Sequence, residues 1–111
     1  MQYLKACVKE SFRLLYPISG VMRVLPCDVV LSNYHIPAGV QILLANALTC
    51  QQNFHDPLTY LPERWLRSED GHLDDVIPKH AVLPFGYGPR NCIGRRFSKQ
   101  ELYHTTVKVR A

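Results

Sequence analysis

The sequence predicts an α+β fold that is mainly helical and carries a small antiparallel β unit. Three observations predict it: apolar residues at helical spacing near the N-terminus, short β-branched runs between Val21 and Asn46, and a glycine-rich loop that leads into a second helical stretch. A chain of 111 residues is expected to form at most one domain, residues 1–111, with a modest core.

The N-terminal segment is expected to form an amphipathic helix over residues 2–15, which Pro17 ends. Its apolar residues recur every three or four positions, namely Leu4, Cys7, Val8, Phe12 and Leu15. The next segment, residues 21–46, is expected to form short antiparallel strands joined by tight turns. Turn residues cut its aliphatic runs at positions 26–28, 32–33 and 37–39.

The second half of the chain is expected to be less regular. A short helix is expected within residues 49–65, where prolines at positions 57 and 62 break the rest into an irregular meander. The polar stretch 67–75 is expected to be an exposed loop. A last helix is expected from about Gly94, although the threonines and valines at positions 105–109 are weak helix formers.

The net charge of the chain favours some classes of binding partner over others. Thirteen basic against nine acidic residues give a net charge of +4, which favours an acidic protein, an anionic cofactor or a membrane surface. Nucleic acid is not expected as a partner, because the basic residues are dispersed and the longest run is Arg95-Arg96. The sequence contains no apolar window of about 18 residues and no signal-peptide pattern.

The four cysteines are widely spaced, which disfavours a disulfide framework and a structural zinc site. Cys92 is different because it lies in the glycine-rich stretch FGYGPRNCIG, residues 85–94. A dinucleotide fingerprint would need glycine where Asn91 stands, and a phosphatase-type loop would need arginine where Ser98 stands. A papain-like thiol enzyme would need a histidine near Cys92, and the sequence pairs none of the five histidines with it.

The same stretch favours a cysteine that binds a metal in a flat cofactor. The expected helix start and the Arg95-Arg96 pair favour the thiolate form of Cys92. Gly86 and Gly88 would let the backbone approach a planar ring, and Arg90 could donate to a carboxylate on that ring. Thiolate ligation and ring carboxylates together point to haem.

Here the sequence resembles the cytochrome P450 superfamily. Residues 85–94 match its haem-binding loop, F-x-x-G-x-R-x-C-x-G. Glu10 and Arg13 match its E-x-x-R helix pair, and PERW at 62–65 matches the element whose arginine, Arg64, completes a Glu-Arg-Arg cluster. The helix pair alone would otherwise be a solvated surface pair. The resemblance covers nearly the whole chain and implies the C-terminal haem-binding portion of that fold.

The resemblance also implies residue roles. Cys92 would be the axial thiolate of haem b iron, and Phe85 would pack beside the sulfur. Arg90 and Arg23 would meet the haem propionates, although Arg23 also fits a solvent-facing strand position. The cluster of Glu10, Arg13 and Arg64 would hold the meander on the helix behind the cysteine loop, a structural role.

The resemblance is closer to mitochondrial than to microsomal members. Lys5 and Lys9, one turn apart, match lysines that dock an acidic iron–sulfur ferredoxin in mitochondrial members; a plain solvated face is the alternative. The expected location is the matrix side of the mitochondrial inner membrane, with the endoplasmic reticulum as alternative. Membrane association is expected only through segments outside these residues.

Two functions stay open. One is a monooxygenase portion, in which the whole protein inserts one oxygen atom from O₂ into a lipophilic, steroid-like substrate. The other is a truncated, catalytically silent polypeptide that binds haem or protein weakly. The second is favoured for the isolated chain, because the long helix that carries the family's acid-threonine pair has no counterpart in the sequence. No catalytic residue is expected here beyond the haem ligand.

Overall fold

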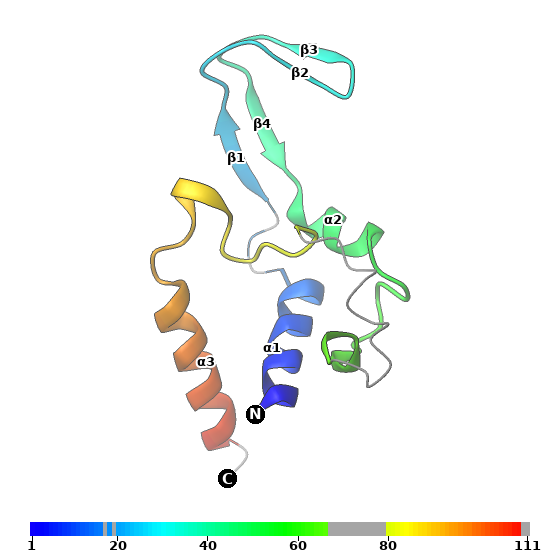
Figure 1. The fold of residues 1–111 in the computed structure, drawn as a ribbon, viewed down its shortest axis with the longest axis vertical. Coiled ribbons are helices and arrows are strands. Elements are labelled where there is room, and N and C mark those ends of the chain that lie inside the picture. Colours follow the sequence, from blue (N-terminus) through cyan, green and yellow to red (C-terminus); the bar gives the residue numbers. More distant parts are fainter. Residues whose placement is uncertain (17, 19, 67–79, 110–111) are drawn as a thin grey trace.

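The computed structural model describes residues 1–16, 18, 20–66 and 80–109. Helix α1 spans Gln2–Leu14, as predicted, and its last turn is closed by the Leu15 N–H, which donates to the Ser11 carbonyl at 2.8 Å. Helix α3 spans Arg95–Val109 and lies beside α1 (Figure 1). The threonines and valines near its end do not stop it, since weak propensity costs only tenths of a kcal/mol per residue, roughly.

In the described part of the chain, four short strands form two antiparallel pairs, as predicted. Strand β1 (Val21–Val24) pairs with β4 (Gln41–Leu44), with Val21 opposite Leu44, and β2 (Val29–Leu31) pairs with β3 (Tyr34–Ile36). The turn between β2 and β3 places Ser32 and Asn33 at φ of 47° and 67°. Two central residues with positive φ are typical of the tight hairpin turns that match the strand twist.

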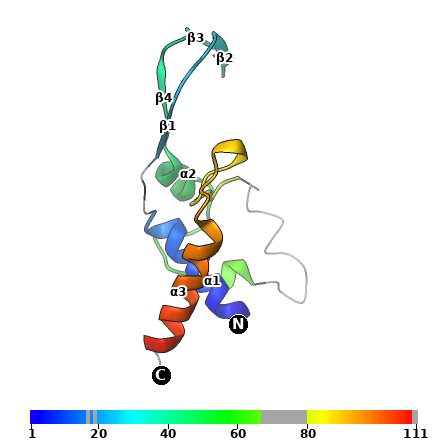
Figure 2. The ribbon, with the colours of Figure 1, turned by 90° about the vertical axis from the view of Figure 1, so that its left-hand side faces the viewer.

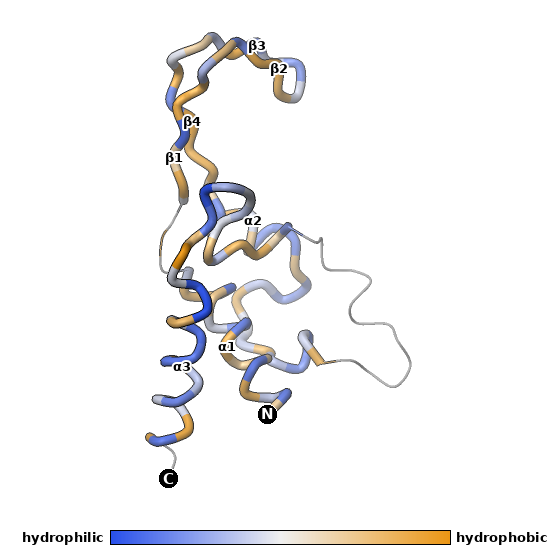
Figure 3. The backbone as a smooth tube through the Cα atoms, turned by 60° about the vertical axis from the view of Figure 1, so that its left-hand side comes forward, coloured by the Kyte–Doolittle hydropathy of each residue, from blue (hydrophilic) through white to orange (hydrophobic). Residues whose placement is uncertain are grey.

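The β unit projects away from the helices, with β2 and β3 at its far end (Figures 1 and 2). Hydrophobic residues run along both β1 and β4 (Figure 3), yet Met22, Val24, Leu43 and Leu44 are all exposed. At its root, a Cβ on Gly20 would lie 2.6 Å from the Leu44 carbonyl oxygen, so only glycine fits there without a shift of the backbone.

The meander is mostly irregular, as predicted. Helix α2 spans Asn46–Gln52 and starts three residues before the expected segment, and two single-turn 3₁₀ helices follow, η1 (Pro62–Trp65) and η2 (Gly88–Arg90). The expected exposed loop at 67–75 lies outside the described residues. None of the helices in the described ranges has the length and apolar character that a bilayer crossing requires.

Burial is concentrated where α1, α2 and η1 meet. In the described ranges the buried apolar residues are Ala6, Cys50 and Ala81, and the largest side chains with no exposure belong to Arg13, Glu10 and Cys50. An ion cluster and a thiol therefore occupy the centre of the molecule where larger aliphatic side chains usually lie.

Candidate haem-thiolate site

The cysteine loop is closed by backbone hydrogen bonds. The Cys92 N–H donates to the Phe85 carbonyl at 2.8 Å, the Gly86 N–H to the Leu83 carbonyl at 3.0 Å, and the Asn91 N–H to the Gly88 carbonyl at 3.1 Å. These bonds hold the backbone of Cys92 against the start of its own loop, which fixes the position from which its side chain extends.

Two glycines in this loop have backbone angles that other residues rarely adopt. Gly86 has φ of 72° and Gly88 has φ of 75°. A Cβ on Gly88 would meet no atom within 4 Å, and a Cβ on Gly86 would make only ordinary contact with Asn91 at 3.7 Å. Within the described chain the glycines are therefore needed for their conformation, and the outer side of Gly88 is left clear for a ligand.

The surface around Cys92 is open and carries both apolar and basic side chains. Cys92 is exposed, and so are the large side chains of Tyr87, Ile93 and Phe97. A planar apolar ligand held through sulfur fits these residues, because the sulfur is accessible and exposed apolar side chains stand next to it. Helix α3 begins three residues after Cys92, and its first turn carries Arg95 and Arg96.

Phe85 is half-buried and contacts both long helices. Its ring packs edge-on against Phe12 of α1, with centroids 5.2 Å apart and planes at 75°. The Lys99 ammonium of α3 lies 5.7 Å from the Phe85 ring centroid. Phe85 therefore connects the cysteine loop to both long helices.

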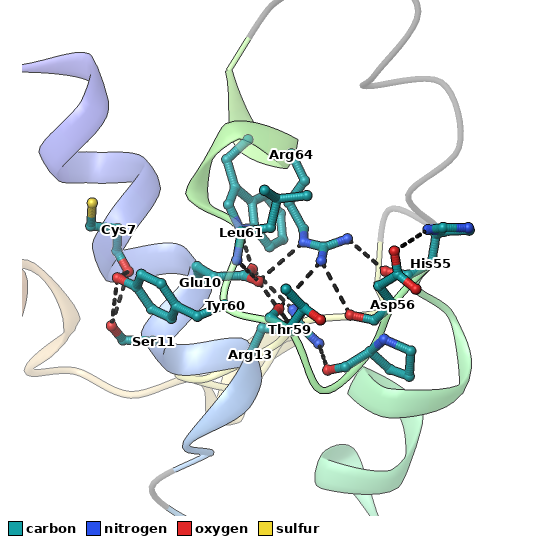
Figure 4. Close-up of polar contacts among 12 residues, drawn as sticks. Cys7, Glu10, Ser11, Arg13, His55, Asp56, Thr59, Tyr60, Leu61 and Arg64 are labelled. Atoms are coloured by element: carbon teal, nitrogen blue, oxygen red, sulfur yellow. Dashed lines mark hydrogen bonds and ion pairs between the residues drawn. The ribbon is translucent and has the colours of Figure 1, made fainter.

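The structure brings Glu10, Arg13 and Arg64 together in one buried cluster (Figure 4). Glu10 has 0% exposure, Arg13 1% and Arg64 7%. Arg13 donates to both carboxylate oxygens of Glu10, from Nε to Oε2 at 2.9 Å and from Nη2 to Oε1 at 2.7 Å, and Arg64 Nε donates to Oε1 at 3.1 Å. This bidentate pairing is the strong form of the arginine–carboxylate interaction.

Two further donors to Glu10 were not expected from the sequence. Trp65 Nε1 donates to Oε2 at 2.8 Å, and the Leu61 backbone N–H donates to Oε1 at 3.0 Å. In the sequence, only the position of Trp65 next to Arg64 indicates that it could reach Glu10. A backbone N–H donor has no counterpart in the sequence pattern. The arginines also bind meander carbonyls, Arg13 that of Pro57 and Arg64 that of His55 at 2.9 Å.

The Glu10 carboxylate is charged at neutral pH. Burial on its own raises its pKa, but the hydrogen bonds from Arg13, the Leu61 N–H and Trp65 outweigh burial and lower the pKa to about 2. One carboxylate thus faces two guanidinium groups, and meander carbonyls accept hydrogen bonds from further N–H groups of both arginines.

The two arginines assigned to haem propionates are both exposed. Arg90 is the last residue of η2, two positions before Cys92. Arg23 lies in β1 opposite Ile42, and its guanidinium donates to the Met22 carbonyl at 2.8 Å. Arg90 is therefore part of the cysteine loop, whereas Arg23 belongs to the projecting β unit.

Lys5 and Lys9 both line the wall of a groove of about 400 Å³ between α1 and α3. The Lys9 ammonium lies 5.3 Å from the Trp65 ring centroid. Sequence reasoning placed the two lysines on one helix face, but it had no means of finding the groove, because the opposite wall comes from α3.

All four cysteines are free. Cys50, which the sequence left without a role, is fully buried and donates through Sγ to the Ala81 carbonyl at 3.2 Å. Burial raises the pKa of the Cys50 thiol. The Cys50–Ala81 hydrogen bond connects α2 to the segment that precedes the cysteine loop.

Comparisons with known proteins agree with this geometry. The model of the family described as Cytochrome P450 matches residues 1–109. Cytochrome P450 302a1, mitochondrial, from Drosophila melanogaster is 40% identical over 109 residues, with 96% of this chain and 21% of the relative covered. Probable cytochrome P450 49a1 from the same fly is 37% identical over 116 residues, with 98% and 20% covered.

A solved structure, retinoic acid bound cyanobacterial CYP120A1, matches with a TM-score of 0.83 at 32% identity, over 96% of this chain and 25% of that one. The α+β fold and the glycine-flanked cysteine loop define the class, and the match to the family model confirms it: the chain belongs to the cytochrome P450 family. It spans about a fifth of the length of these curated relatives.

Proposed function

We propose that residues 1–111 are the C-terminal haem-binding portion of a cytochrome P450 monooxygenase, a single partial domain in which Cys92 is the axial ligand of haem b iron. The observation that carries the proposal is the exposed Cys92 side chain on a loop closed by the Cys92–Phe85 hydrogen bond of 2.8 Å. When bound, a thiolate-ligated haem supplies oxygen activation by O–O bond cleavage.

The residues of this chain bind and orient the cofactor. Cys92 would present the sulfur, Arg90 and Arg23 would donate hydrogen bonds to the propionates, and the positive φ of Gly86 and Gly88 would let the loop lie close to the ring. Phe85, packed on Phe12, keeps water from the inner side of the loop. Glu10, Arg13 and Arg64 keep the meander folded against α1.

The activity proposed for the whole protein is insertion of one oxygen atom from O₂ into a lipophilic substrate, with steroids as the first class to test. Membership of the family supports it. The isolated chain is proposed to be catalytically silent, because it spans about a fifth of its relatives and buries few apolar residues in its described part.

The electron donor proposed for the whole protein is an acidic iron–sulfur ferredoxin that docks at Lys5 and Lys9, both exposed on α1. The proposed location is the matrix side of the mitochondrial inner membrane. Relatives such as Probable cytochrome P450 12a5, mitochondrial, 39% identical, support both proposals by their names.

The test of the haem site is spectroscopic. We expect the chain, mixed with haem and reduced under carbon monoxide, to show the red-shifted Soret band of a thiolate-ligated haem. Cys92→Ser should abolish this band, because an alcohol does not replace a thiolate ligand. Cys27→Ser, which changes another exposed cysteine, is the matched control and should keep the band. A band that survives Cys92→Ser would refute the assignment.

A further inference from the structure

The groove between α1 and α3 combines an apolar floor with a basic rim. Six apolar or aromatic side chains line it, from Val8, Phe12, Trp65, Val82, Pro84 and Tyr103. The remaining lining residues are Lys5, Lys9 and Lys99. Its volume of about 400 Å³ lies within the usual range of small-molecule sites.

The three lysines concentrate positive charge at this groove. Lys5 and Lys9 are one turn apart on α1, and Lys99 faces them from α3. Partial burial, and then repulsion from Arg95 and Lys9, lower the pKa of Lys99. Within the described residues none of the three lysines takes part in an ion pair, and no acidic side chain lines the groove.

Two of the three ammonium groups also contact an aromatic ring. Lys9 lies 5.3 Å from the Trp65 ring centroid and Lys99 lies 5.7 Å from that of Phe85. Such contacts orient the ammonium groups and leave their N–H donors open to an anion.

We propose that this α1–α3 groove binds one amphipathic anion, a carboxylate with an unbranched aliphatic chain of the fatty-acid class. The carboxylate would accept hydrogen bonds from Lys99 and from Lys5 or Lys9, and the chain would lie on Val8, Phe12 and Pro84. Charge complementarity selects the headgroup, since the described lining residues include three cations and no acid, which favours an anion. The apolar floor favours an aliphatic tail, since a small ion without a tail would leave these apolar side chains in contact with water.

The site does not include the thiol of the cysteine loop. The Cys92 thiol does not line the groove, so ligand binding needs neither the thiol nor haem. The same lysines are proposed to meet the electron donor, and a bound carboxylate would therefore compete with that protein for the surface.

The test uses decanoate as probe, followed by isothermal titration calorimetry and by fluorescence of Trp65, the one tryptophan of the chain. We expect saturable binding of one decanoate per chain. Octanoate should bind more weakly, by about fourfold for each methylene lost, which is the fold-change for burying one CH₂ group. Decanol and acetate, which lack the charge and the tail respectively, should each bind far more weakly.

Variants of the rim lysines test whether decanoate binds in this groove. Lys99→Gln should weaken decanoate binding roughly tenfold, and Lys99→Arg should restore it, because a charged hydrogen bond is lost and regained. The matched control is Lys108→Gln, on the same helix and outside the groove. If Lys99→Gln fails to fold, the surface double variant of Lys5→Gln with Lys9→Gln tests the same rim, with an expected loss of roughly fivefold.

Three results would overturn the proposal: decanol binding as tightly as decanoate, no effect of both rim variants, or an equal loss in Lys108→Gln. Cys92→Ser should leave decanoate binding unchanged while it abolishes the thiolate band. The haem site and the groove can therefore fail independently.

Discussion

Glu10 is the residue on which the packing of the meander most depends. It accepts hydrogen bonds from Arg13, Arg64, Trp65 and the Leu61 N–H, and none of its surface is exposed. A buried carboxylate of this kind must stay ionised, because two buried guanidinium groups depend on its charge. We therefore place its contribution in stability and not in chemistry.

The sign of the pH effect follows from the lowered pKa. Glu10 titrates at about 2 in the folded chain against an ordinary value of 4.5, so its stabilisation is complete above pH 4.5 and is lost as the pH falls toward 2. At neutral pH it amounts to on the order of 3 kcal/mol. Glu10→Gln should lower the free energy of unfolding by about 3–5 kcal/mol, since two guanidinium groups lose their counter-charge.

The measurement is urea unfolding between pH 2 and pH 8. Glu101→Gln, an exposed position on α3, is the matched control and should change the free energy of unfolding by less than about 0.5 kcal/mol. A Glu10→Gln variant that keeps the parental pH profile would contradict the prediction.

At the scale of elements, the two faces of α1 make different contacts. Glu10 and Arg13 face the meander, and Ala6 joins them in the buried interior. Lys5 and Lys9 lie on the exposed side, facing the groove with α3. One helix therefore links the packing behind the cysteine loop to the surface proposed for the electron donor.

The docking proposal predicts a salt-dependent reaction. In a full-length protein that carries this sequence, replacing Lys5 and Lys9 together by glutamine should slow electron transfer from an acidic ferredoxin by roughly tenfold at low ionic strength, since opposite charges steer the encounter. The difference should shrink as salt screens the charges.

Stopped-flow reduction at several ionic strengths measures this effect. Lys108→Gln, at the far end of α3, controls for the loss of a positive charge elsewhere. Were the double variant to show the parental salt dependence, the donor would dock on another surface.

At the scale of the whole molecule, the chain is extended. Its radius of gyration is 16.7 Å and its longest dimension is 53 Å, whereas a compact chain of this length has a radius of gyration of about 13 Å. Exposed large apolar side chains are spread over the β unit and α3, including Val30, Leu31, Tyr34 and Val109. Stability is therefore expected to be uneven along the chain.

Hydrogen exchange should show this unevenness. In the isolated chain we expect the amides of α1 from Ala6 to Arg13 to be protected at least roughly tenfold more than those of β2 and β3, because α1 contacts the buried cluster while the far strands contact mainly each other. Exchange at neutral pH, followed by mass spectrometry of peptic fragments, measures it. Equal protection in both regions would mean that the β unit has support other than the described contacts.

Several elements could be predicted from the sequence because their signals are local. The spacing of Leu4, Val8 and Phe12 predicts α1, and the turn residues Ser32 and Asn33 predict the β2–β3 hairpin. The start of α2 was predicted three residues late, since the segment from Asn46 carries no side-chain cap to mark it. Helix α3 continues to Val109 through weak helix formers, because weak propensities do not decide where a helix stops.

The sequence by itself determined the family, the cysteine of the glycine-rich loop proposed as the haem ligand, and the three residues that form the ion cluster, because these depend on residue types at given spacings. Only the tertiary structure decided the donors from Trp65 and the Leu61 N–H to Glu10, the thiol of Cys50 against the Ala81 carbonyl, and the groove that Lys99 completes. The physical reason is that each of these joins residues at least 31 positions apart or an atom of the backbone, and neither leaves a pattern in the order of the side chains.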